Sequence, residues 1–307
     1  MPFERRPWFL TLFQLQGSVI PAVLPRTLIC VSFGLLISVL YAVGVPVAIS
    51  TLGSLVPSIV LGLLLVFRTN TAYERFWEGR KQWGILVNTS RNLARQIWVA
   101  VDETEEQDHY TKIRNLRLIV AFAIAIKLHL RGEPLNAELS EVVTPEQFTK
   151  LQIMNNPPLE IAFWLADYLQ TCCDRSKLNP YQLSAMLQLI DRLVDALGSC
   201  ERILKTPIPL AYSIHLKQLL ILYCLALPFQ MVESLHWWTA LITGLISFAV
   251  FGIEAIGIEI ENPFGHDPND LPLDAICQTM HHNIEDLITL TPGNCRWLKE
   301  RRNGGVT

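Results

Sequence analysis

The polar side chains best placed to act on an ion come just after a long apolar stretch. Arg68, Asn70 and Arg75 follow this stretch in the string FRTNTAYER. Cationic and amide groups at the mouth of a pore raise the local concentration of anions, which is one interpretation of these residues. In the other interpretation they anchor a membrane helix at the interface, while Glu74 and Glu78 pair with neighbouring basic side chains. The residues alone leave both interpretations open.

A second group of polar side chains lies in the string NPFGHDPNDLPLD. Asp267, Asn269 and Asp270 carry hard oxygen donors in a loop punctuated by proline and glycine, and such donors suit calcium. The string does not have the spacing of an EF-hand loop. From the residues alone, a calcium site is therefore one interpretation of this loop, and a purely structural loop is the other.

No catalytic pattern accompanies these groups. His281 and His282 are followed by Glu285, which is not the spacing of a zinc protease motif, and we interpret them as a polar helix face. The sequence contains no glycine-rich phosphate loop and no nucleophile elbow. It therefore predicts that the protein is not an enzyme and requires no cofactor.

Two apolar blocks must position the polar groups. No charged residue occurs from Thr27 to Phe67, and the block from Leu210 to Ile253 contains only Lys217 and Glu233. One crossing of a bilayer needs about 20 apolar residues, so each block is long enough to cross twice. The chain is 17% charged, against about 25% in soluble domains. We expect an all-α integral membrane protein with spans at residues 27–45, 52–67, 211–232 and 234–257.

These spans divide the chain into four segments. Residues 1–67 hold the N-terminal segment and the first hairpin, and residues 210–258 hold the second hairpin. Residues 68–209 form a large cytosolic helical insert, and residues 259–307 form a cytosolic C-terminal segment. Within the insert, residues 113–130 are apolar but include Lys127 and His129, so we expect a buried helix there rather than a fifth span.

The distribution of basic residues gives the orientation. Arginine and lysine precede the first span, follow the second and recur in the C-terminal tail, while the turns inside the two hairpins carry none. The positive-inside rule then predicts that both termini and the insert lie on the cytoplasmic side. The sequence is compatible with a bacterial inner membrane or with a thylakoid membrane.

The second span carries an apolar stripe. Val56, Val60 and Leu64 recur every four residues and share one face of a helix. Such a stripe faces lipid or packs on another helix in many membrane proteins. It also forms a hydrophobic constriction when several copies of the helix surround an axis, and such a ring controls conduction through wetting and dewetting. A single helix does not separate these interpretations.

Three strings make the chain resemble the bestrophin family of ion channels, in particular its bacterial and plant-plastid branch. They are FRTNTAYERFWEGRKQWGILVNTSRNLARQ at 67–96, GSCERILKTPIPLAY at 198–212 and IEIENPFGHDPNDLPLDAICQTM at 258–280. They occur in corresponding order, and the resemblance covers nearly all of the chain. It implies a homopentamer around one axial pore, with four membrane helices per subunit and a large cytosolic helical part.

The resemblance also implies positions for two constrictions. The family's second membrane helix lines a narrow neck, whose positions correspond to Val56, Val60 and Leu64. These residues are aliphatic here, without the phenylalanines of animal relatives. A further constriction at the cytosolic exit corresponds to Tyr181, where the family usually has a small aliphatic residue. Leu178 and Gln182 are alternatives for this position.

Calcium receives partial support from the resemblance. Animal bestrophins bind it through an acidic cluster after the NPFG string, and Asp267 and Asp270 match two of the ligand positions. His266, Pro268 and Asn269 stand where other acids occur. Bacterial relatives need no calcium for opening, so calcium is an optional ligand rather than a required cofactor.

The functional expectation is a passive channel for chloride and other monovalent anions. A neck with few charges selects by the cost of dehydration, which favours large, weakly hydrated anions. A monovalent cation channel of the same architecture is the alternative, because bacterial relatives include cation-conducting members. A non-conducting membrane scaffold is a further alternative. The expected partners are other copies of the chain, the lipid bilayer and the permeant ions, with no nucleic acid.

Overall fold

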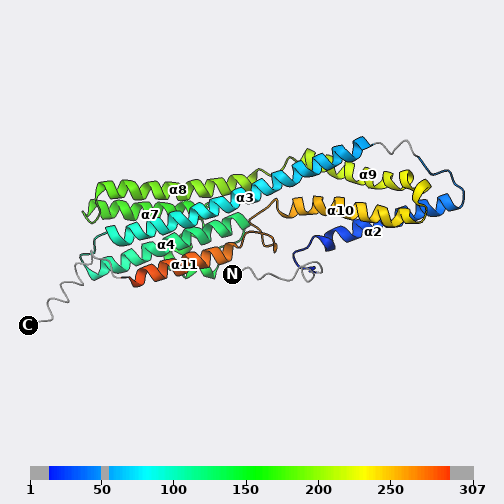
Figure 1. Cartoon of the computed structure of the whole chain (residues 1–307). Helices are drawn as coiled ribbons and strands as arrows, with labels where there is room; N and C mark the ends of the chain where they lie inside the picture. Colours follow the sequence, from blue (N-terminus) through cyan, green and yellow to red (C-terminus); the bar gives the residue numbers. More distant parts are fainter. Residues whose placement is uncertain (1–13, 50–54, 291–307) are drawn as a thin grey trace, which may run out of the picture. The chain divides into compact units, whose positions relative to one another are not determined.

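The regular elements of the chain are all helices in the computed structural model, which describes residues 14–49 and 55–290 (Figure 1). The side chains of residues 55 and 56 also lie outside the description. The chain divides into two compact units, one of residues 1–77 with 207–270 and one of residues 78–206 with 271–307. The predicted all-α fold is confirmed for the described residues.

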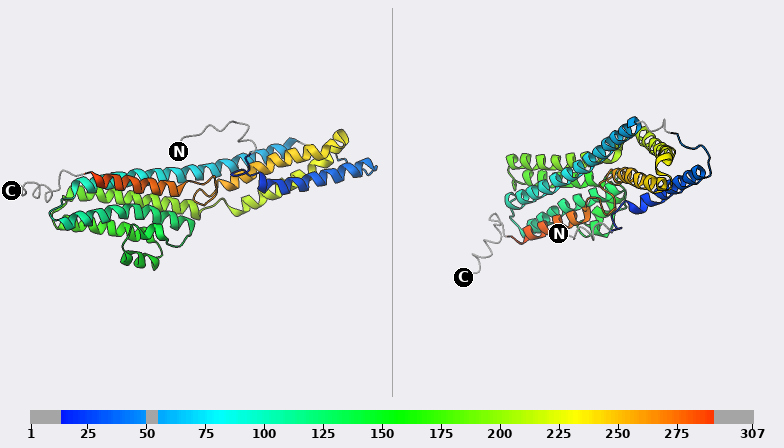
Figure 2. Two further views of the ribbon diagram at one scale, coloured as in Figure 1. Left: turned by 90° about the horizontal axis from the view of Figure 1, so that it is seen from below. Right: turned by 45° about the vertical axis from the view of Figure 1, so that its right-hand side comes forward.

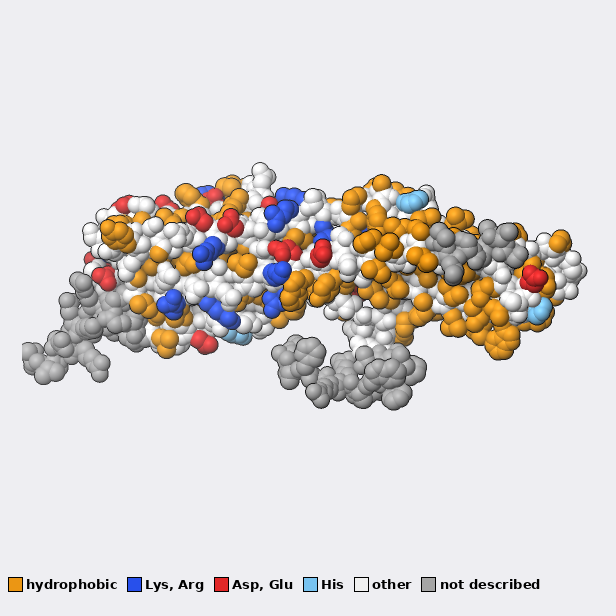
Figure 3. Space-filling view, turned by 45° about the horizontal axis from the view of Figure 1, so that its top comes forward, with side chains coloured by type: hydrophobic (Ala, Val, Ile, Leu, Met, Phe, Trp, Pro, Cys, Tyr) orange, Lys and Arg blue, Asp and Glu red, His pale blue; other side chains and the backbone are white. Residues whose placement is uncertain are grey.

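The first unit is a bundle of long apolar helices. It contains α2 (Ile20–Ala42), the N-terminal part of α3 (Leu55–Ala100), α9 (Leu210–Leu235) and α10 (Trp238–Glu259). α10 packs against both α2 and α9, and α2 packs against α9 (Figure 1). Hydrophobic side chains cover much of the visible surface of these helices in Figure 3, as expected for surfaces that face lipid.

Three described helices are long and apolar enough to cross a membrane, namely α2, α9 and α10. They correspond to the first, third and fourth predicted spans. α2 begins at Ile20 rather than at Thr27, because Pro21 lies in the first helical turn, where proline has no hydrogen bond to lose. The second predicted span is not among the three. Residues 52–54 lie outside the described residues, and residues 55–67 form the start of α3.

Small residues let α2 and α10 approach closely. A Cβ atom added at Gly34 would lie 3.1 Å from the Ala240 Cα, and one added at Gly244 would lie 2.5 Å from the Val31 Cγ2. The Ser38 hydroxyl donates to the Gly34 carbonyl at 2.9 Å and to the His236 carbonyl at 3.1 Å. No hydrophobic effect drives helices together within lipid, so their association depends on close packing and hydrogen bonds of this kind.

The second unit is a helical bundle (Figure 2), and charged side chains are scattered over the face of it that Figure 3 shows. It contains the rest of α3, then α4 (Glu106–Arg131), α5 (Ala137–Ser140), α6 (Pro145–Gln152), α7 (Pro157–Asp174), α8 (Pro180–Lys205) and α11 (Leu273–Thr289). α4 contacts α7, α8 and α11 and is buried almost continuously from Leu118 to Leu128. The expectation of a buried helix at residues 113–130 is confirmed.

Ion pairs make the burial of Lys127 in α4 tolerable. Its side chain is 2% exposed, and the ammonium group donates to Asp274 at 2.8 Å and to Glu138 at 2.5 Å. Burial lowers the pKa of Lys127, but these hydrogen bonds outweigh burial and raise it. The hydrogen bonds from Arg131 and Lys127 lower the pKa of Asp274 to about 2. The lysine that interrupts the apolar pattern in the sequence is therefore an ion-paired residue in the core of the second unit.

The contact between α2 and α10 predicts a large effect of side-chain size. Gly34→Leu should lower the stability of the detergent-solubilised protein by about 1–3 kcal/mol, because the added atoms meet the α10 backbone. Thermal unfolding measures this change. Gly252→Leu is the matched control, since a Cβ atom there meets nothing within 4 Å. Equal melting temperatures for both variants would contradict the close packing.

Candidate pore-lining helix and its anchor

One face of α3 is fixed against its own subunit. Leu61, Leu65 and Arg68 are each 4% exposed, and Ala72 is 0% exposed. These positions recur at the spacing of one helix face. Leu61 and Leu65 share a core with residues of α2, α9 and α10, including Cys30, Leu220 and Phe251. We call the four α3 residues the buried seam.

The opposite face of α3 is apolar and exposed in the single chain. Ile59 is 66% exposed and Leu63 is 54% exposed. Residues two positions apart on an α-helix lie about 200° apart around its axis, so Ile59 and Leu63 point away from Leu61. Asn70 is exposed further along the helix. A large apolar surface of this kind marks a contact with lipid, with another subunit or with a pore.

Two members of the stripe predicted from the sequence, Val60 and Leu64, lie on the flank between these two faces. Val56 lies in the first turn of α3, and its side chain is outside the described residues. Val60 is 47% exposed. Leu64 is half-buried and packs against the subunit core, and its carbonyl oxygen accepts a hydrogen bond of 2.7 Å from the Tyr212 hydroxyl. Leu64 is thus partly engaged within its own subunit.

Arg68 is anchored inside the subunit rather than exposed. Its Nη2 donates to Glu261 Oε2 at 2.8 Å, and its Nη1 donates to Ser213 Oγ at 3.1 Å. A Cβ atom added at Gly257 would lie 3.3 Å from the Arg68 Cγ, so glycine leaves room for the arginine stem. The guanidinium group therefore joins α3 to α9 and to the segment after α10.

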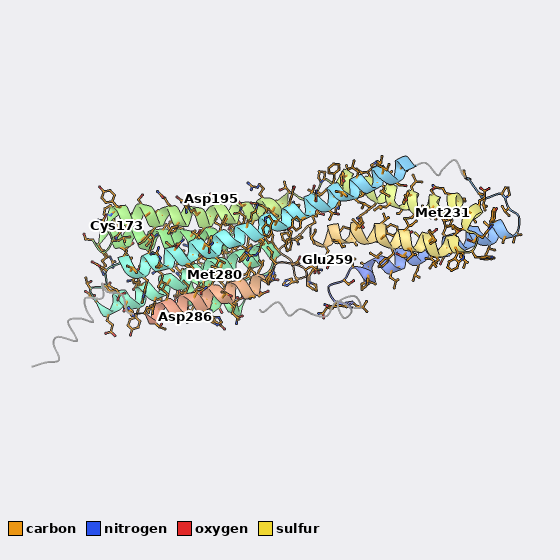
Figure 4. The ribbon with its side chains drawn as sticks, in the orientation of Figure 1. Cys173, Asp195, Met231, Glu259, Met280 and Asp286 are labelled. Atoms are coloured by element: carbon orange, nitrogen blue, oxygen red, sulfur yellow. The ribbon has the colours of Figure 1, made fainter. Side chains whose placement is uncertain are left out.

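Glu261 completes this anchor. Glu259, labelled in Figure 4, is the last residue of α10, and Glu261 follows in the next turn. The second carboxylate oxygen of Glu261 accepts from the Ile208 N–H at 2.9 Å, and its carbonyl oxygen accepts from Arg75 Nε at 3.1 Å. Burial lowers the pKa of Arg75, while the charge of Glu261 opposes this shift. One acid thus holds two arginines of α3.

The proposed cytosolic constriction residue lies in the second unit. Tyr181 is the second residue of α8 and is 88% exposed. The Asn179 side chain accepts a hydrogen bond of 2.9 Å from the Tyr181 N–H, which fixes the start of the helix. Leu178, one of the alternatives, is 4% exposed and buried in the core of this unit. The ring of Tyr181 is therefore presented by a capped helix end.

The loop after α10, where calcium is expected as an optional ligand, is tied together by hydrogen bonds of its own residues. Asp270 Oδ2 accepts a hydrogen bond of 2.8 Å from the Asp267 N–H, so this carboxylate closes its own loop. Asn269 Nδ2 donates to Glu259 Oε1 at 2.7 Å and to the Gly17 carbonyl at 3.1 Å. Across the described residues, no group of three or more His, Cys, Asp or Glu side chains converges. Calcium takes about six to eight oxygen ligands, so a site here would also need backbone carbonyls, and calcium binding by Asp267 and Asp270 stays a prediction.

Sequence reasoning missed the role of Glu261 and Ser213. Both residues occur in the strings that carry the family resemblance or directly follow them, but neither has a spacing that predicts a partner. Their pairing with Arg68 joins residues 145 and 193 positions apart in the chain. Only the packing of α3 on α9 and α10 brings them together.

Comparison with known proteins identifies the family. The sequence profile described as "Bacterial/Fungal Bestrophin protein" matches residues 2–286. The chain belongs to the bestrophin family. It is 63% identical over 292 residues to a voltage-dependent anion channel-forming protein of Nostoc sp., covering 95% of each chain. It is 61% identical over 287 residues to a protein of the same description from Synechocystis sp., covering 94% of each.

Solved structures agree with this family. A mutant of a bacterial bestrophin homologue from Klebsiella pneumoniae superimposes with a TM-score of 0.81 at 29% sequence identity. The superposition covers 90% of this chain and 100% of the other. The protein is therefore an all-helical integral membrane protein of bestrophin type, and its curated relatives are channel-forming proteins rather than enzymes.

The Arg68 anchor predicts that removing one partner of the ion pair lowers the stability of the protein more than replacing both partners with apolar residues. Glu261→Ala should lower stability by about 3 kcal/mol, because it leaves the Arg68 charge buried without its acid. The double variant Arg68→Met with Glu261→Leu should recover much of this loss. Thermal unfolding of the three proteins measures the coupling. Glu259→Ala is the control, since Glu259 pairs with Asn269 instead. A double variant no more stable than Glu261→Ala would contradict the anchor.

Proposed function

We propose that the protein forms a voltage-dependent anion channel, with chloride as the default permeant ion. The observation that carries the proposal is the 63% identity over 95% of both chains to a relative described as a voltage-dependent anion channel-forming protein. More distant relatives of the same description, such as one from Ralstonia nicotianae at 30% identity over 92% of each chain, support the same function.

In the proposed assembly, five copies surround one axis and α3 lines the pore. The buried seam attaches each α3 to its own subunit, so the opposite face is the one available to the axis. This argument favours Ile59 and Leu63 as neck residues and places Val60 at the edge, toward a neighbouring α3. Leu64 then supports the helix from behind. Rings of aliphatic side chains contributed by the five subunits would keep the neck close to the transition between its hydrated and dehydrated states.

The proposed pathway continues past α3. Asn70 follows the neck on the same face and offers an amide to a passing anion. Arg68 contributes less directly than the sequence suggested, because its charge is compensated by Glu261. Tyr181 forms the cytosolic aperture in this account. We further propose that both termini lie on the cytoplasmic side, which follows from the positive-inside distribution and an even number of spans.

Calcium has no part in the proposed conduction mechanism. Asp267 and Asp270 would be its first ligands, and calcium would act there as an optional ligand of the loop whose Asp267 N–H donates to the Asp270 carboxylate. Opening is proposed to depend on the hydration of the neck, which membrane voltage biases through the ions themselves. An anion enters because dehydration costs less for a large anion than for a small, strongly hydrated ion.

The reversal potential under a potassium chloride gradient tests the charge sign of the permeant ion. Purified oligomer in a planar bilayer should give a reversal potential close to the chloride equilibrium potential. A value close to the potassium equilibrium potential would replace the proposal with the cation channel. Complete electrical silence of the intact oligomer would favour the membrane scaffold.

Two neighbouring leucines, Leu63 and Leu64, separate the proposed pore face of α3 from the side that packs on its own subunit. Leu63→Ala should widen the neck and raise conductance or open probability several-fold, with little loss of stability, because Leu63 is exposed in the subunit. Leu64→Ala should chiefly lower stability, by about 1–2 kcal/mol, because Leu64 packs against the core. Single-channel recording and thermal unfolding of both variants measure this. If Leu64→Ala instead raised conductance and Leu63→Ala lowered stability, the stripe of Val56, Val60 and Leu64 would be the neck.

The aperture predicts an effect of Tyr181 on selectivity. Tyr181→Ala should change the relative permeability among anions of different size, while assembly and stability stay unchanged, because the side chain is 88% exposed in the subunit. Bi-ionic reversal potentials with chloride against larger anions give the ratio. Phe163→Ala, which truncates an aromatic side chain on α7 that is 59% exposed, is the control. Identical permeability ratios for both variants would remove Tyr181 from the pathway.

A further inference from the structure

A trough between α2, α9 and α10 combines an apolar floor with two cations at one end. It has a volume of about 350 Å³. Leu220 and Phe251 form a buried floor, and Ile221, 54% exposed, forms part of the rim. Arg26 and Lys217 lie in the same trough. All of these residues belong to the first unit.

The two cations lie at the same end of the helix bundle. Arg26 is in the second turn of α2 and Lys217 is in the third turn of α9, both near the helix N-termini. Glu254 is near the C-terminus of α10, and Arg26 reaches it with an Nη1–Oε2 distance of 3.5 Å. These helices therefore present one polar end, as expected where membrane helices meet lipid headgroups.

The charges in the trough do not balance. Glu254 has a side chain that is only 3% exposed and lies behind Arg26, whose side chain is 52% exposed. Lys217 is exposed, and among the described residues no acid pairs with it. A cation on a membrane helix is costly unless it finds a partner or reaches the interface. An anionic lipid headgroup would form ion pairs with Lys217 and with the exposed side of the Arg26 guanidinium group.

We propose that this trough binds one anionic phospholipid. The phosphate lies between Arg26 and Lys217, and an acyl chain lies along the apolar floor. From Lys217 to Leu225 the floor extends eight residues along α9, or about 12 Å, which suits the upper part of an acyl chain. Basic pockets between membrane helices on the cytoplasmic side recognise anionic headgroups in this way. The lipid would tie α2 to α9 and so brace the bundle against which α3 packs.

Native mass spectrometry of the full-length oligomer tests the site. The protein in detergent is mixed with phosphatidylglycerol or, in a separate sample, with phosphatidylcholine of the same acyl chains. The detergent is then removed in the instrument, and the lipid that stays bound is measured. The parent should retain phosphatidylglycerol preferentially. Lys217→Gln should reduce that retention about fivefold and leave phosphatidylcholine unchanged, since one interfacial cation contributes about 1 kcal/mol. Lys81→Gln, an exposed lysine outside the trough, is the matched control and should bind as the parent does.

A second variant tests the acyl-chain part of the trough. Ile221→Trp fills the rim without changing a charge, and it should reduce retention of both lipids. Equal retention of the two lipids by the parent, or unchanged phosphatidylglycerol retention in Lys217→Gln, would overturn the proposal. An oligomer structure in which a neighbouring subunit fills the trough would overturn it as well.

Discussion

The buried pairing of Arg68 with Glu261 is the constraint on which the rest of the first unit depends. It fixes the rotation of α3 about its own axis, because the guanidinium group reaches α9 and the segment after α10 at once. Once that rotation is set, Leu61 and Leu65 must face the core, and Ile59 and Leu63 must face away from it. In the proposed channel α3 needs such an anchor, because turning the helix about its axis would exchange the lining side chains for packing ones.

The sequence was sufficient for the helical class, the apolar blocks and the family. Long runs without charge predict membrane helices because the bilayer core excludes unpaired charge, and three of the predicted spans correspond to observed apolar helices. The buried helix around Lys127 was also predictable, because a lysine and a histidine inside an apolar run fit a core with acidic partners better than lipid. These predictions need only the local composition of each segment, which can be read directly from the sequence.

The orientation of α3 was not predictable in the same way. Val56, Val60 and Leu64 satisfy the helical period, but so do Ile59 and Leu63, because the whole segment is apolar. The period of a uniformly apolar helix carries no information about which face packs on the subunit. The role of Arg68 was hidden for a related reason: its partners lie far away in the sequence, so an interior ion pair and a pore-mouth cation give the same local pattern.

The central claim is that the face of α3 opposite its buried seam lines a water-filled anion pathway. Thiol accessibility tests it most directly, with single cysteines placed at residues 63 and 65 and currents compared with the parent protein. A charged, membrane-impermeant thiol reagent should block current through Leu63→Cys and leave Leu65→Cys unaffected, because Leu65 is 4% exposed in the core. Block at residue 65 with no effect at residue 63 would contradict the account.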